Sequence, residues 1–120
     1  MTPTQIAIAP TFVPILLERS ARAIKITYKE LLAQACERFP TNPYVQQAIP
    51  LHVGDILSVI RTFGKPRGYP DLTALAVNQQ GEVGAPGTDG PKERNAISKH
   101  DWSKFQEEFD AWIVELGKVG

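Results

Sequence analysis

The chain has 120 residues, of which 42% are hydrophobic and 22% charged, and these proportions predict one soluble globular domain spanning residues 1–120. Thirteen Lys and Arg residues balance thirteen Asp and Glu residues, which excludes a protein that coats nucleic acid through bulk charge but allows a local basic patch. The single cysteine, Cys36, excludes an internal disulfide.

The first residues show no targeting signal. "MTPTQIAIAP" has no basic region and no small-residue cleavage site, so we expect no signal peptide. The apolar runs stay well below the roughly 18 residues that a membrane span needs. We therefore expect a cytoplasmic protein with no membrane-spanning part.

The first predicted elements are a helix and a short strand. Residues 1–10 are expected to form a loose lead-in or a short edge strand. Apolar residues then recur at helical spacing, which predicts a helix over about 12–22 with Pro14 in its first turn. The alternation in "AIKIT" favours a short strand at 23–27.

A second helix start follows at Thr27. Its hydroxyl can accept a hydrogen bond from the backbone N–H of Glu30, whose carboxylate can accept one from the N–H of Thr27, an arrangement called a capping box. Apolar residues at helical spacing follow, and Pro40 and Pro43 end the pattern. The sequence therefore predicts a helix over about 28–39.

The central part of the chain predicts a helix followed by a hairpin. "LHVGDILSVIRTFG" has one apolar face, which predicts a helix over about 51–63, with Gly64 in the left-handed conformation just after it. "DLTALAVN" has the content of a strand at 71–78. A turn at 78–81 would lead into a second arm at 82–83.

The stretch "GEVGAPGTDGPK" carries glycine at every third position. It is too short for collagen, which needs many uninterrupted triplets in three chains. Nucleotide-binding loops need glycines between a strand and a helix that follow each other directly, and this stretch does not fit that pattern. We therefore expect a flexible surface loop, rich in Gly and Pro, over 84–97.

The last predicted element is an amphipathic helix over 98–117. Trp102, Phe105, Phe109 and Trp112 fall at alternating steps of three and four. An aromatic stripe of this density is more often the lid of a core than a cofactor site. It can close its own core or pair with a second copy, so a homodimer through this helix is an open alternative.

No catalytic, metal or cofactor motif stands out in the sequence. The metal-ligating residue types Cys36, His52 and His100 lie in different predicted elements. His52 and Asp55 are one helical turn apart but are too few for a metal site. No nucleophile is accompanied by a recognisable base and orienting group. We therefore expect a non-enzymatic protein without cofactor or metal. An enzyme stays an alternative only if the fold brings Cys36, His52 or His100 beside carboxylates.

The order of the predicted elements over residues 12–83 is helix, short strand, two helices and β-hairpin. This order is typical of winged-helix domains, so the predicted fold class is α+β, winged-helix-like, with an added C-terminal amphipathic helix. In such domains the third helix lies in the major groove and the hairpin touches the adjacent backbone. We therefore expect the region 51–69 to contact duplex DNA, with the hairpin tip at 78–81 beside it.

The predicted DNA contacts come from this helix and the connector after it. They are His52, Ser58, Arg61, Thr62, Lys65 and Arg67. The three cations lie within seven positions without an acid among them and would bind phosphates, whereas the other three would read or position the bases. Asp55 on the same helix would repel phosphates. A winged-helix domain that binds a partner protein therefore stays an equal alternative.

Parts of residues 24–90 carry a pattern that resembles a family of small bacterial proteins and mobile-element reading frames. In this family a "TYxEL" helix start precedes a "PxLTALVVN" strand and a "GxPG" turn. The corresponding segments here read "ITYKEL", "YPDLTALAVN" and "GAPG". With this context, the alternative function is a protein-interaction or inhibitor module of a phage-related or defence system, acting through the loop 84–97 and the C-terminal helix.

The segment "ITYKEL" is also similar to the opening of the winged-helix portion of alkylguanine DNA alkyltransferase-like proteins. The reactive Pro-Cys-His-Arg motif of those proteins has no counterpart here, because Cys36 lies in a predicted helix without it. This resemblance therefore implies a winged-helix architecture and a nucleic-acid context, and no alkyl transfer.

Overall fold

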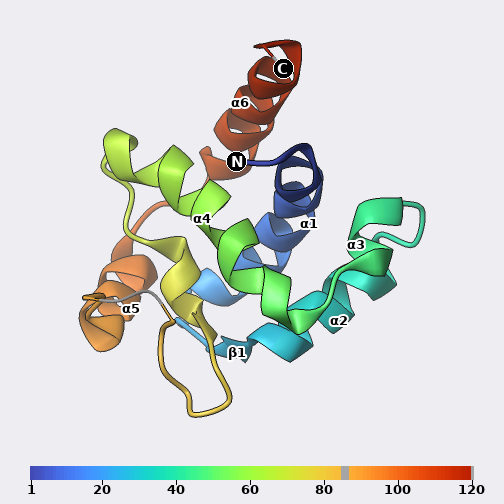
Figure 1. Ribbon diagram of the computed structural model, residues 1–120. Helices are drawn as coiled ribbons and strands as arrows, with labels where there is room; N and C mark the ends of the chain where they lie inside the picture. The colour runs from blue at the N-terminus through green and yellow to red at the C-terminus, as the bar shows by residue number, and fades with distance from the viewer. Residues whose placement is uncertain (85–86, 120) are drawn as a thin grey trace.

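The computed structural model describes residues 1–84 and 87–119 and shows a mostly helical α+β fold (Figure 1). Within these residues there is one sheet, of two short parallel strands. The elements in chain order are α1 (Pro3–Ser20), β1 (Ile26–Thr27), α2 (Tyr28–Arg38), α3 (Pro43–Gln47), the 3₁₀ helix η1 (Pro50–His52), α4 (Val53–Gly64), η2 (Lys65–Arg67), η3 (Leu72–Leu75), β2 (Ala76–Val77), α5 (Gly90–Lys99) and α6 (Phe105–Val119).

The first helix starts much earlier than predicted. The expectation of a lead-in or edge strand at 1–10 is wrong, because α1 begins at Pro3. Thr2 caps it with a second capping box: its Oγ1 accepts from the N–H of Gln5 at 3.1 Å, and its own N–H donates to Gln5 Oε1 at 3.0 Å. The predicted range 12–22 covers only the later part of this helix.

Two prolines lie inside α1, at Pro10 and Pro14. A proline in a helix interior costs about 3 kcal/mol, because it lacks an N–H and its ring crowds the preceding turn. Burying one large apolar side chain contributes about 1.5–3 kcal/mol. Several such side chains of α1 are fully buried: Ile8, Phe12, Val13, Ile15 and Leu16. Burial therefore outweighs the two prolines.

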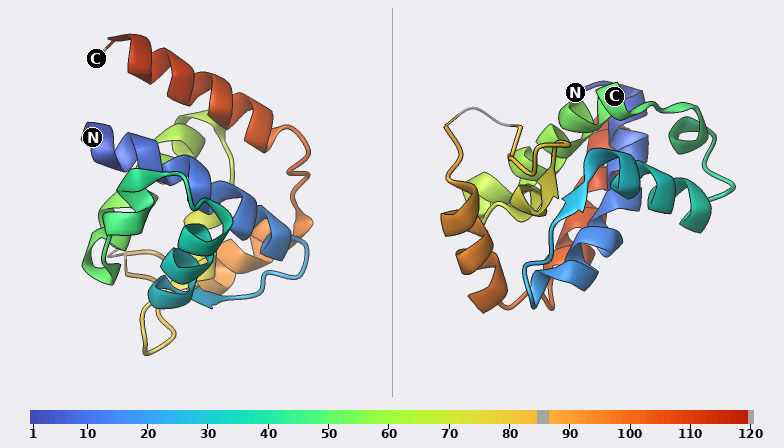
Figure 2. Two further views of the ribbon diagram at one scale, coloured as in Figure 1. Left: turned by 90° about the vertical axis from the view of Figure 1, so that its right-hand side faces the viewer. Right: turned by 90° about the horizontal axis from the view of Figure 1, so that it is seen from below.

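Helix α1 is the central element of the core. It contacts α2, α3, α4, α6 and η3, and Figure 2 shows α6 running alongside it. The rings of Phe12, Phe63, Phe105 and Phe109 are among the largest fully buried side chains, and they come from α1, α4 and α6. One apolar core thus joins the two ends of the chain with its middle.

The predictions of α2 and α4 are confirmed to within two residues. At α2, the N–H of Glu30 donates to Thr27 Oγ1 at 3.1 Å and the N–H of Thr27 donates to Glu30 Oε1 at 3.3 Å, as the capping box predicts. The prediction for Gly64 is wrong: it has φ −78° and is the last residue of α4. Gly68 takes the left-handed conformation instead, with φ 77°, after the extra turn η2.

The structure does not show the predicted hairpin. Only β2, within the predicted strand 71–78, is extended, and it pairs with β1 in parallel, with Ile26 beside Ala76. The start of that range forms η3, because Asp71 accepts a hydrogen bond from the N–H of Thr73 and caps a helical turn. A winged-helix fold with a β-hairpin is therefore not confirmed.

The turn after β2 exists without a second strand. The N–H of Asn78 donates to the carbonyl of Glu82 at 2.8 Å, and its side-chain oxygen accepts from the N–H groups of Gln80 and Glu82 at 3.0 Å. Residues 82–83 are not extended into a strand. The local turn chemistry was predicted correctly, but the pairing was not.

The predicted loop 84–97 contains a helix. Its later part forms α5, which Asp89 caps by accepting from the N–H of Lys92 at 3.2 Å, with Pro91 in the first turn. Ile97 is fully buried and anchors this helix to the core. Residues 85–86 of the predicted loop lie outside the described residues.

The predicted C-terminal helix 98–117 is two helices. Residues 98–99 end α5, and α6 begins at Phe105. Between them the indole N–H of Trp102 donates to the carbonyl of Ile97 at 2.9 Å. Phe105 and Phe109 are fully buried in their own chain. The aromatic stripe is therefore the lid of its own core, and a homodimer cannot use these two rings.

Candidate functional site

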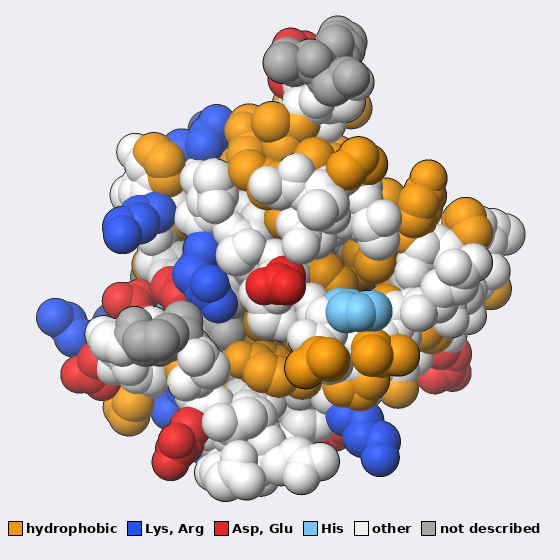
Figure 3. Space-filling view, viewed as in Figure 1, with side chains coloured by type: hydrophobic (Ala, Val, Ile, Leu, Met, Phe, Trp, Pro, Cys, Tyr) orange, Lys and Arg blue, Asp and Glu red, His pale blue; other side chains and the backbone are white. Residues whose placement is uncertain are grey.

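Helix α4 carries two different surfaces, one around its start and one around its end. Figure 3 shows hydrophobic side chains gathered around the start of α4, whereas Lys and Arg side chains gather over its end. The residues predicted to contact DNA are divided between them: His52 is at the start, and Arg61, Lys65 and Arg67 are at the end.

Arg61 does not project freely towards solvent. Its Nε donates to Thr73 Oγ1 at 3.0 Å and lies 3.6 Å from Asp71 Oδ2. Thr73 is buried, and it in turn donates from its hydroxyl and its N–H to Asp71 Oδ1. The guanidinium is therefore held against η3 in a fixed position. Neither of its Nη groups makes a hydrogen bond to another described residue.

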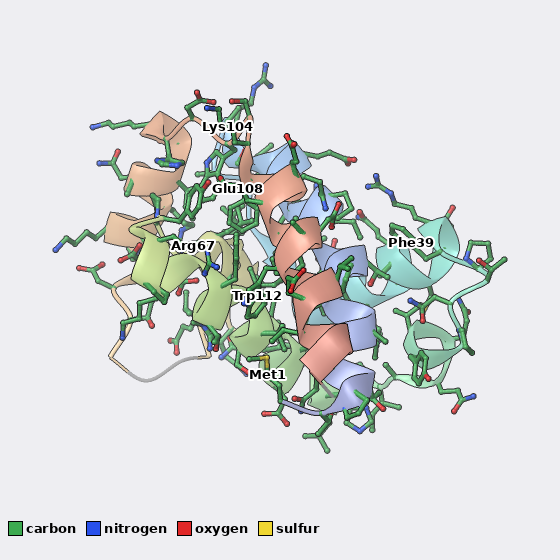
Figure 4. The ribbon with its side chains drawn as sticks, turned by 90° about the horizontal axis from the view of Figure 1, so that it is seen from above. Met1, Phe39, Arg67, Lys104, Glu108 and Trp112 are labelled. Atoms are coloured by element: carbon green, nitrogen blue, oxygen red, sulfur yellow. The ribbon has the colours of Figure 1, made fainter. Side chains whose placement is uncertain are left out.

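Arg67 is also held within its own chain. Its Nη1 donates to the carbonyl of Phe63 at 2.7 Å, and its guanidinium carbon lies 4.2 Å from the centre of the Phe63 ring. The ring of Trp112 lies 6.0 Å away, and Figure 4 shows Arg67 and Trp112 on the seam between α4 and α6. This cation–π contact covers the end of the core and engages the charge that was predicted to bind phosphate.

The predicted base-reading residues make local hydrogen bonds. The hydroxyl of Ser58 donates to the carbonyl of Asp55 at 2.6 Å, and that of Thr62 donates to the carbonyl of Ser58 at 2.8 Å. His52 Nδ1 accepts from the N–H of Ile49 at 3.3 Å. These bonds leave the three side chains on the surface of the helix, but they do not point them at a common ligand.

A hollow of about 410 Å³ lies at the end of α4. It is bordered by Arg61 and Lys65 from α4 and η2, by the segment 69–72, and by Lys92 and Glu93 from the start of α5. Its apolar wall includes Ile60, Leu72 and Phe105. The structure thus brings two of the six predicted residues together in one cavity, with a third cation that was predicted to lie in a loop.

The surface around the start of α4 is almost uncharged. Residues 1–17 and 39–60 contain none of the thirteen Lys and Arg residues, and Asp55 is their only acidic residue. These two segments lie together, because α1 contacts both α3 and α4. We call this surface the low-charge face. Its exposed members include Tyr44, Ile49, Leu51, His52 and Asp55.

The low-charge face exposes large apolar side chains beside a second hollow. Leu51 is 83% exposed, and Tyr44 and Ile49 are each 48% exposed. The hollow has a volume of about 420 Å³ and is bordered by Tyr44, His52 and Asp55, with Ile8 and Ile56 in its wall. Leu51 and Ile49 do not line this hollow, whose rim is mixed and places Thr and Gln side chains beside Tyr44. A hollow of this kind can receive one inserted side chain.

Among residues 1–84 and 87–119, no three His, Cys, Asp or Glu side chains lie together as a metal site would require. The metal-ligating residue types have different neighbours. Cys36 Sγ donates to the carbonyl of Val45 at 3.2 Å, whereas His100 packs against the rings of Tyr69 and Trp102. In the part of the chain that the structure describes, no helix combines the length and apolar character of a transmembrane segment.

No protein-family model matches the chain, and no match was found among curated proteins or solved structures. The resemblance to small bacterial and mobile-element proteins therefore stays a prediction.

Sequence reasoning missed most of both surfaces. Leu51 and Ile49 were not singled out, although the long run without Lys or Arg around them can be read from the sequence. The pair Asp71 and Thr73 has the spacing of a helix cap, but it was taken as part of a strand. Lys92 could have been placed at a helix start by the Asp-Gly-Pro before it.

Proposed function

We propose that this protein is a protein-binding module and that the low-charge face is its contact surface. The observation that carries the proposal is the group of exposed apolar side chains on this face, led by Leu51 at 83% exposure, together with the hollow that Tyr44 borders. A single exposed leucine is common, but contiguous apolar surface that is poor in charge is typical of the centre of a protein interface.

The chemistry of the face also describes the partner. Asp55 is its only acidic side chain, and its carboxylate makes no hydrogen bond or ion pair with the described residues. An inserted aliphatic or aromatic side chain would fill the hollow bordered by Tyr44 and Ile56. A Lys or Arg next to it would pair with Asp55. We therefore expect a partner segment with one large apolar residue and one cation close together.

Selection from a displayed peptide library with the purified protein tests this proposal. We expect enriched peptides that combine a large apolar residue with Lys or Arg. Leu51→Asp should weaken their binding tenfold or more, because truncating or charging a central interface residue costs about 2 kcal/mol or more. Ile24→Asp is the matched control, since Ile24 is 49% exposed but belongs to neither segment of the face.

The proposal is wrong if no peptide is enriched, or if the Leu51 and Ile24 variants weaken binding equally. Asp55→Lys should select peptides that carry Asp or Glu in place of the cation. A partner that binds at the C-terminal helix or at the loop after β2 would respond to neither Leu51 nor Asp55. The setting in a phage-related or defence system stays a prediction.

The second candidate function is contact with duplex DNA through the region 51–69. It is supported by the cations Arg61 and Lys65, which border one hollow with Lys92 at the end of α4. It is weakened by Arg67, which is engaged with Phe63. A winged-helix relationship would fit this function. The order of α1, β1, α2 and α4 and the turn at 78–82 support it, whereas the parallel pairing of β1 with β2 opposes it.

A mobility-shift assay with random duplex at low salt separates the two functions. DNA contact requires a shift at micromolar protein. The combined change of Arg61, Lys65 and Arg67 to Gln must weaken that binding and flatten its salt dependence, because fewer counterions are released. Leu51→Asp should leave a DNA shift unchanged. Absence of any shift removes the DNA function and leaves the protein-binding proposal as it is.

A further inference from the structure

The hollow at the end of α4 lies on a different surface from the low-charge face and has the features of a small-molecule site. Its volume of about 410 Å³ falls within the range of ligand pockets. One wall is apolar: the half-buried Tyr69 and Pro70 supply its accessible surface, and the buried Ile60, Leu72 and Phe105 also line it. The rim carries Lys and Arg side chains with Asp and Glu among them, as Figure 3 shows over the end of α4 and beside α5.

Arg61 is the fixed group of this hollow. Its Nε is held by the buried Thr73, which is held in turn by Asp71, so the orientation of the guanidinium is set by its neighbours. Both Nη groups lack a hydrogen bond to the described residues. Two adjacent N–H groups of a positioned guanidinium match the two oxygens of a carboxylate or phosphate. Arg61 therefore has the geometry of an anion receptor.

The acidic residues of the hollow are occupied by backbone groups. Glu93 accepts from the N–H of Asp71 at 3.1 Å, Asp71 accepts from the N–H of Thr73 at 3.1 Å, and Asp89 accepts from the N–H of Lys92 at 3.2 Å. These acids fix η3 and the start of α5. Lys65 and Lys92 have exposed side chains and no ion pair with the described residues. The N–H donors left for a ligand are therefore those of Arg61, Lys65 and Lys92, while the three carboxylates keep their negative charge.

The balance of charge limits the kind of anion. Three cations and three acids border the hollow, so its total charge is zero. A polyanion such as a duplex gains from many unopposed cations and would meet three carboxylates here. A ligand with a single carboxylate or phosphate group needs only the Arg61 fork and one or two lysines. The apolar wall favours a flat apolar body attached to that group.

We propose that this hollow binds a small organic oxyanion, with its carboxylate or phosphate group on Arg61 and the lysines Lys65 and Lys92, and its apolar body against Tyr69 and Pro70. Nuclear magnetic resonance titration of the full chain tests the site with four probes: benzoate, phenyl phosphate, inorganic phosphate and benzyl alcohol. Benzoate or phenyl phosphate should give saturable shifts at the backbone amides of Gly64 and Leu72, which border the hollow.

The other two probes test the two halves of the ligand. Inorganic phosphate lacks the apolar body and benzyl alcohol lacks the charge. Each should therefore bind at least about tenfold more weakly than phenyl phosphate. If inorganic phosphate binds as tightly as phenyl phosphate, the apolar wall takes no part and the proposal is overturned. It is also overturned if no probe gives a saturable shift.

Variants assign the binding to named side chains. Arg61→Gln should weaken phenyl phosphate at least tenfold, because it removes a charge-assisted pair of hydrogen bonds. Arg61→Lys keeps the positive charge but loses the two adjacent N–H donors. Its affinity for phenyl phosphate should therefore lie between those of the native protein and Arg61→Gln. Lys92→Gln should weaken binding about threefold, because a single exposed ion pair contributes little to binding. Lys99→Gln, at the other end of the same helix, should have no effect.

A second route protects the test from loss of folding at Arg61. The double change of Lys65 and Lys92 to Gln alters only exposed side chains and should weaken phenyl phosphate about tenfold. Unchanged affinity in this variant overturns the proposal. A random duplex is added as competitor. If it displaces phenyl phosphate at a concentration below that at which phenyl phosphate half-saturates the protein, the hollow is a DNA-backbone contact and the small-ligand assignment is wrong.

Discussion

The two ends of helix α4 differ in charge although they rest on the same core. Its start, with Val53 and Ile56 inward, packs beside α1 and η1, which carry almost no charged residues. Its end, with Ile60 and Phe63 inward, faces η3 and α5. The hollow there is bordered by three Lys and Arg residues and three Asp and Glu residues. A net charge of zero therefore describes neither surface. The distribution of charge, rather than its total, decides what each end can bind.

The comparison also shows that cations close in sequence differ in availability. Arg61 is held by a hydrogen-bond network, but neither of its two Nη groups has a hydrogen-bond partner among the described residues. Arg67 covers the ring of Phe63. Lys65, between them in sequence, is exposed. Three charges that look equivalent as a basic cluster thus have three different roles.

The largest expected effect comes from Phe63→Ala, which tests whether both surfaces depend on one core. The Phe63 ring contacts Tyr69, Phe105, Phe109 and Trp112. Its removal should cost about 3–5 kcal/mol in the free energy of unfolding. Urea denaturation followed by circular dichroism and by tryptophan fluorescence should give one coincident transition.

Phe39→Ala is the control for this change. Phe39 is half-buried at the end of α2, away from α4 and α6 in Figure 4, so its truncation should cost clearly less. Equal losses in the two variants, or separate transitions for the two probes, would show that the two ends of α4 do not share one cooperative core.

The next largest effect is expected from Thr73→Val. This substitution breaks the hydrogen-bond network of Arg61, Thr73 and Asp71 at the end of α4 without changing the charge of the hollow. It removes the hydroxyl that accepts from Arg61 Nε and donates to Asp71 Oδ1, so Arg61 Nε loses its hydrogen-bond acceptor while Asp71 Oδ1 keeps the bond from the N–H of Thr73. Unsatisfied buried groups cost about 1–3 kcal/mol in the free energy of unfolding. Thr62→Val removes an exposed hydroxyl that donates to its own helix, and it should change stability by less than about 0.5 kcal/mol.

Thermal and urea unfolding of both variants measure this difference. If Thr73→Val is as mild as Thr62→Val, the network does not position Arg61, and the contrast between a fixed arginine and exposed lysines fails.

The local rules of the sequence were sufficient where they acted alone. The capping box at Thr27 and the apolar spacing of α4 predicted two helices correctly. They were insufficient where burial decided the outcome. Pro14 was placed in the first turn of a helix that starts near residue 12, yet the buried side chains around Pro10 and Pro14 keep α1 continuous from Pro3. The sequence also could not show that β2 pairs with β1 in parallel, since partner choice depends on the packing of distant elements.

The candidate sites were predictable in part for the same reason. Arg61 and Lys65 were selected from the sequence as available cations, but the contacts that fix Arg61 come from η3, twelve positions later. Lys92 reaches the same hollow only because α5 forms where a loop was predicted. The low-charge face needed only a count of charges along the chain, together with the finding that α1 and α4 are neighbours.

A smaller change in stability is expected from Tyr69→Phe. It tests the contact between Tyr69, at the end of α4, and Glu108 of α6. A hydrogen bond from its hydroxyl to Glu108, together with burial, raises the pKa of Tyr69 to about 12. The unfolded chain has a tyrosine pKa near 10. The bond therefore adds stability that is fully present below about pH 10 and is lost as the pH rises towards 12.

Phenolate absorbance measures this directly. The chain has three tyrosines, and the component that titrates last should vanish in Tyr69→Phe and move to lower pH in Glu108→Gln. The stability advantage of the native chain over Tyr69→Phe should shrink above pH 10. An advantage that stays constant up to pH 12 would show that the Tyr69 hydroxyl is not bound to Glu108.

The smallest expected change in stability belongs to Leu51→Gln, at the start of α4. Leu51 is 83% exposed, so the fold gains little from its side chain, and the free energy of unfolding should change by less than about 0.5 kcal/mol. The same substitution should reduce binding of a hydrophobic dye and of selected peptides, because it removes the most exposed apolar group of the low-charge face. A loss of more than about 1 kcal/mol in stability would mean that Leu51 is packed by its own chain. The start of α4 would then be core rather than contact surface, and the difference between its two ends would be one of burial and not of function.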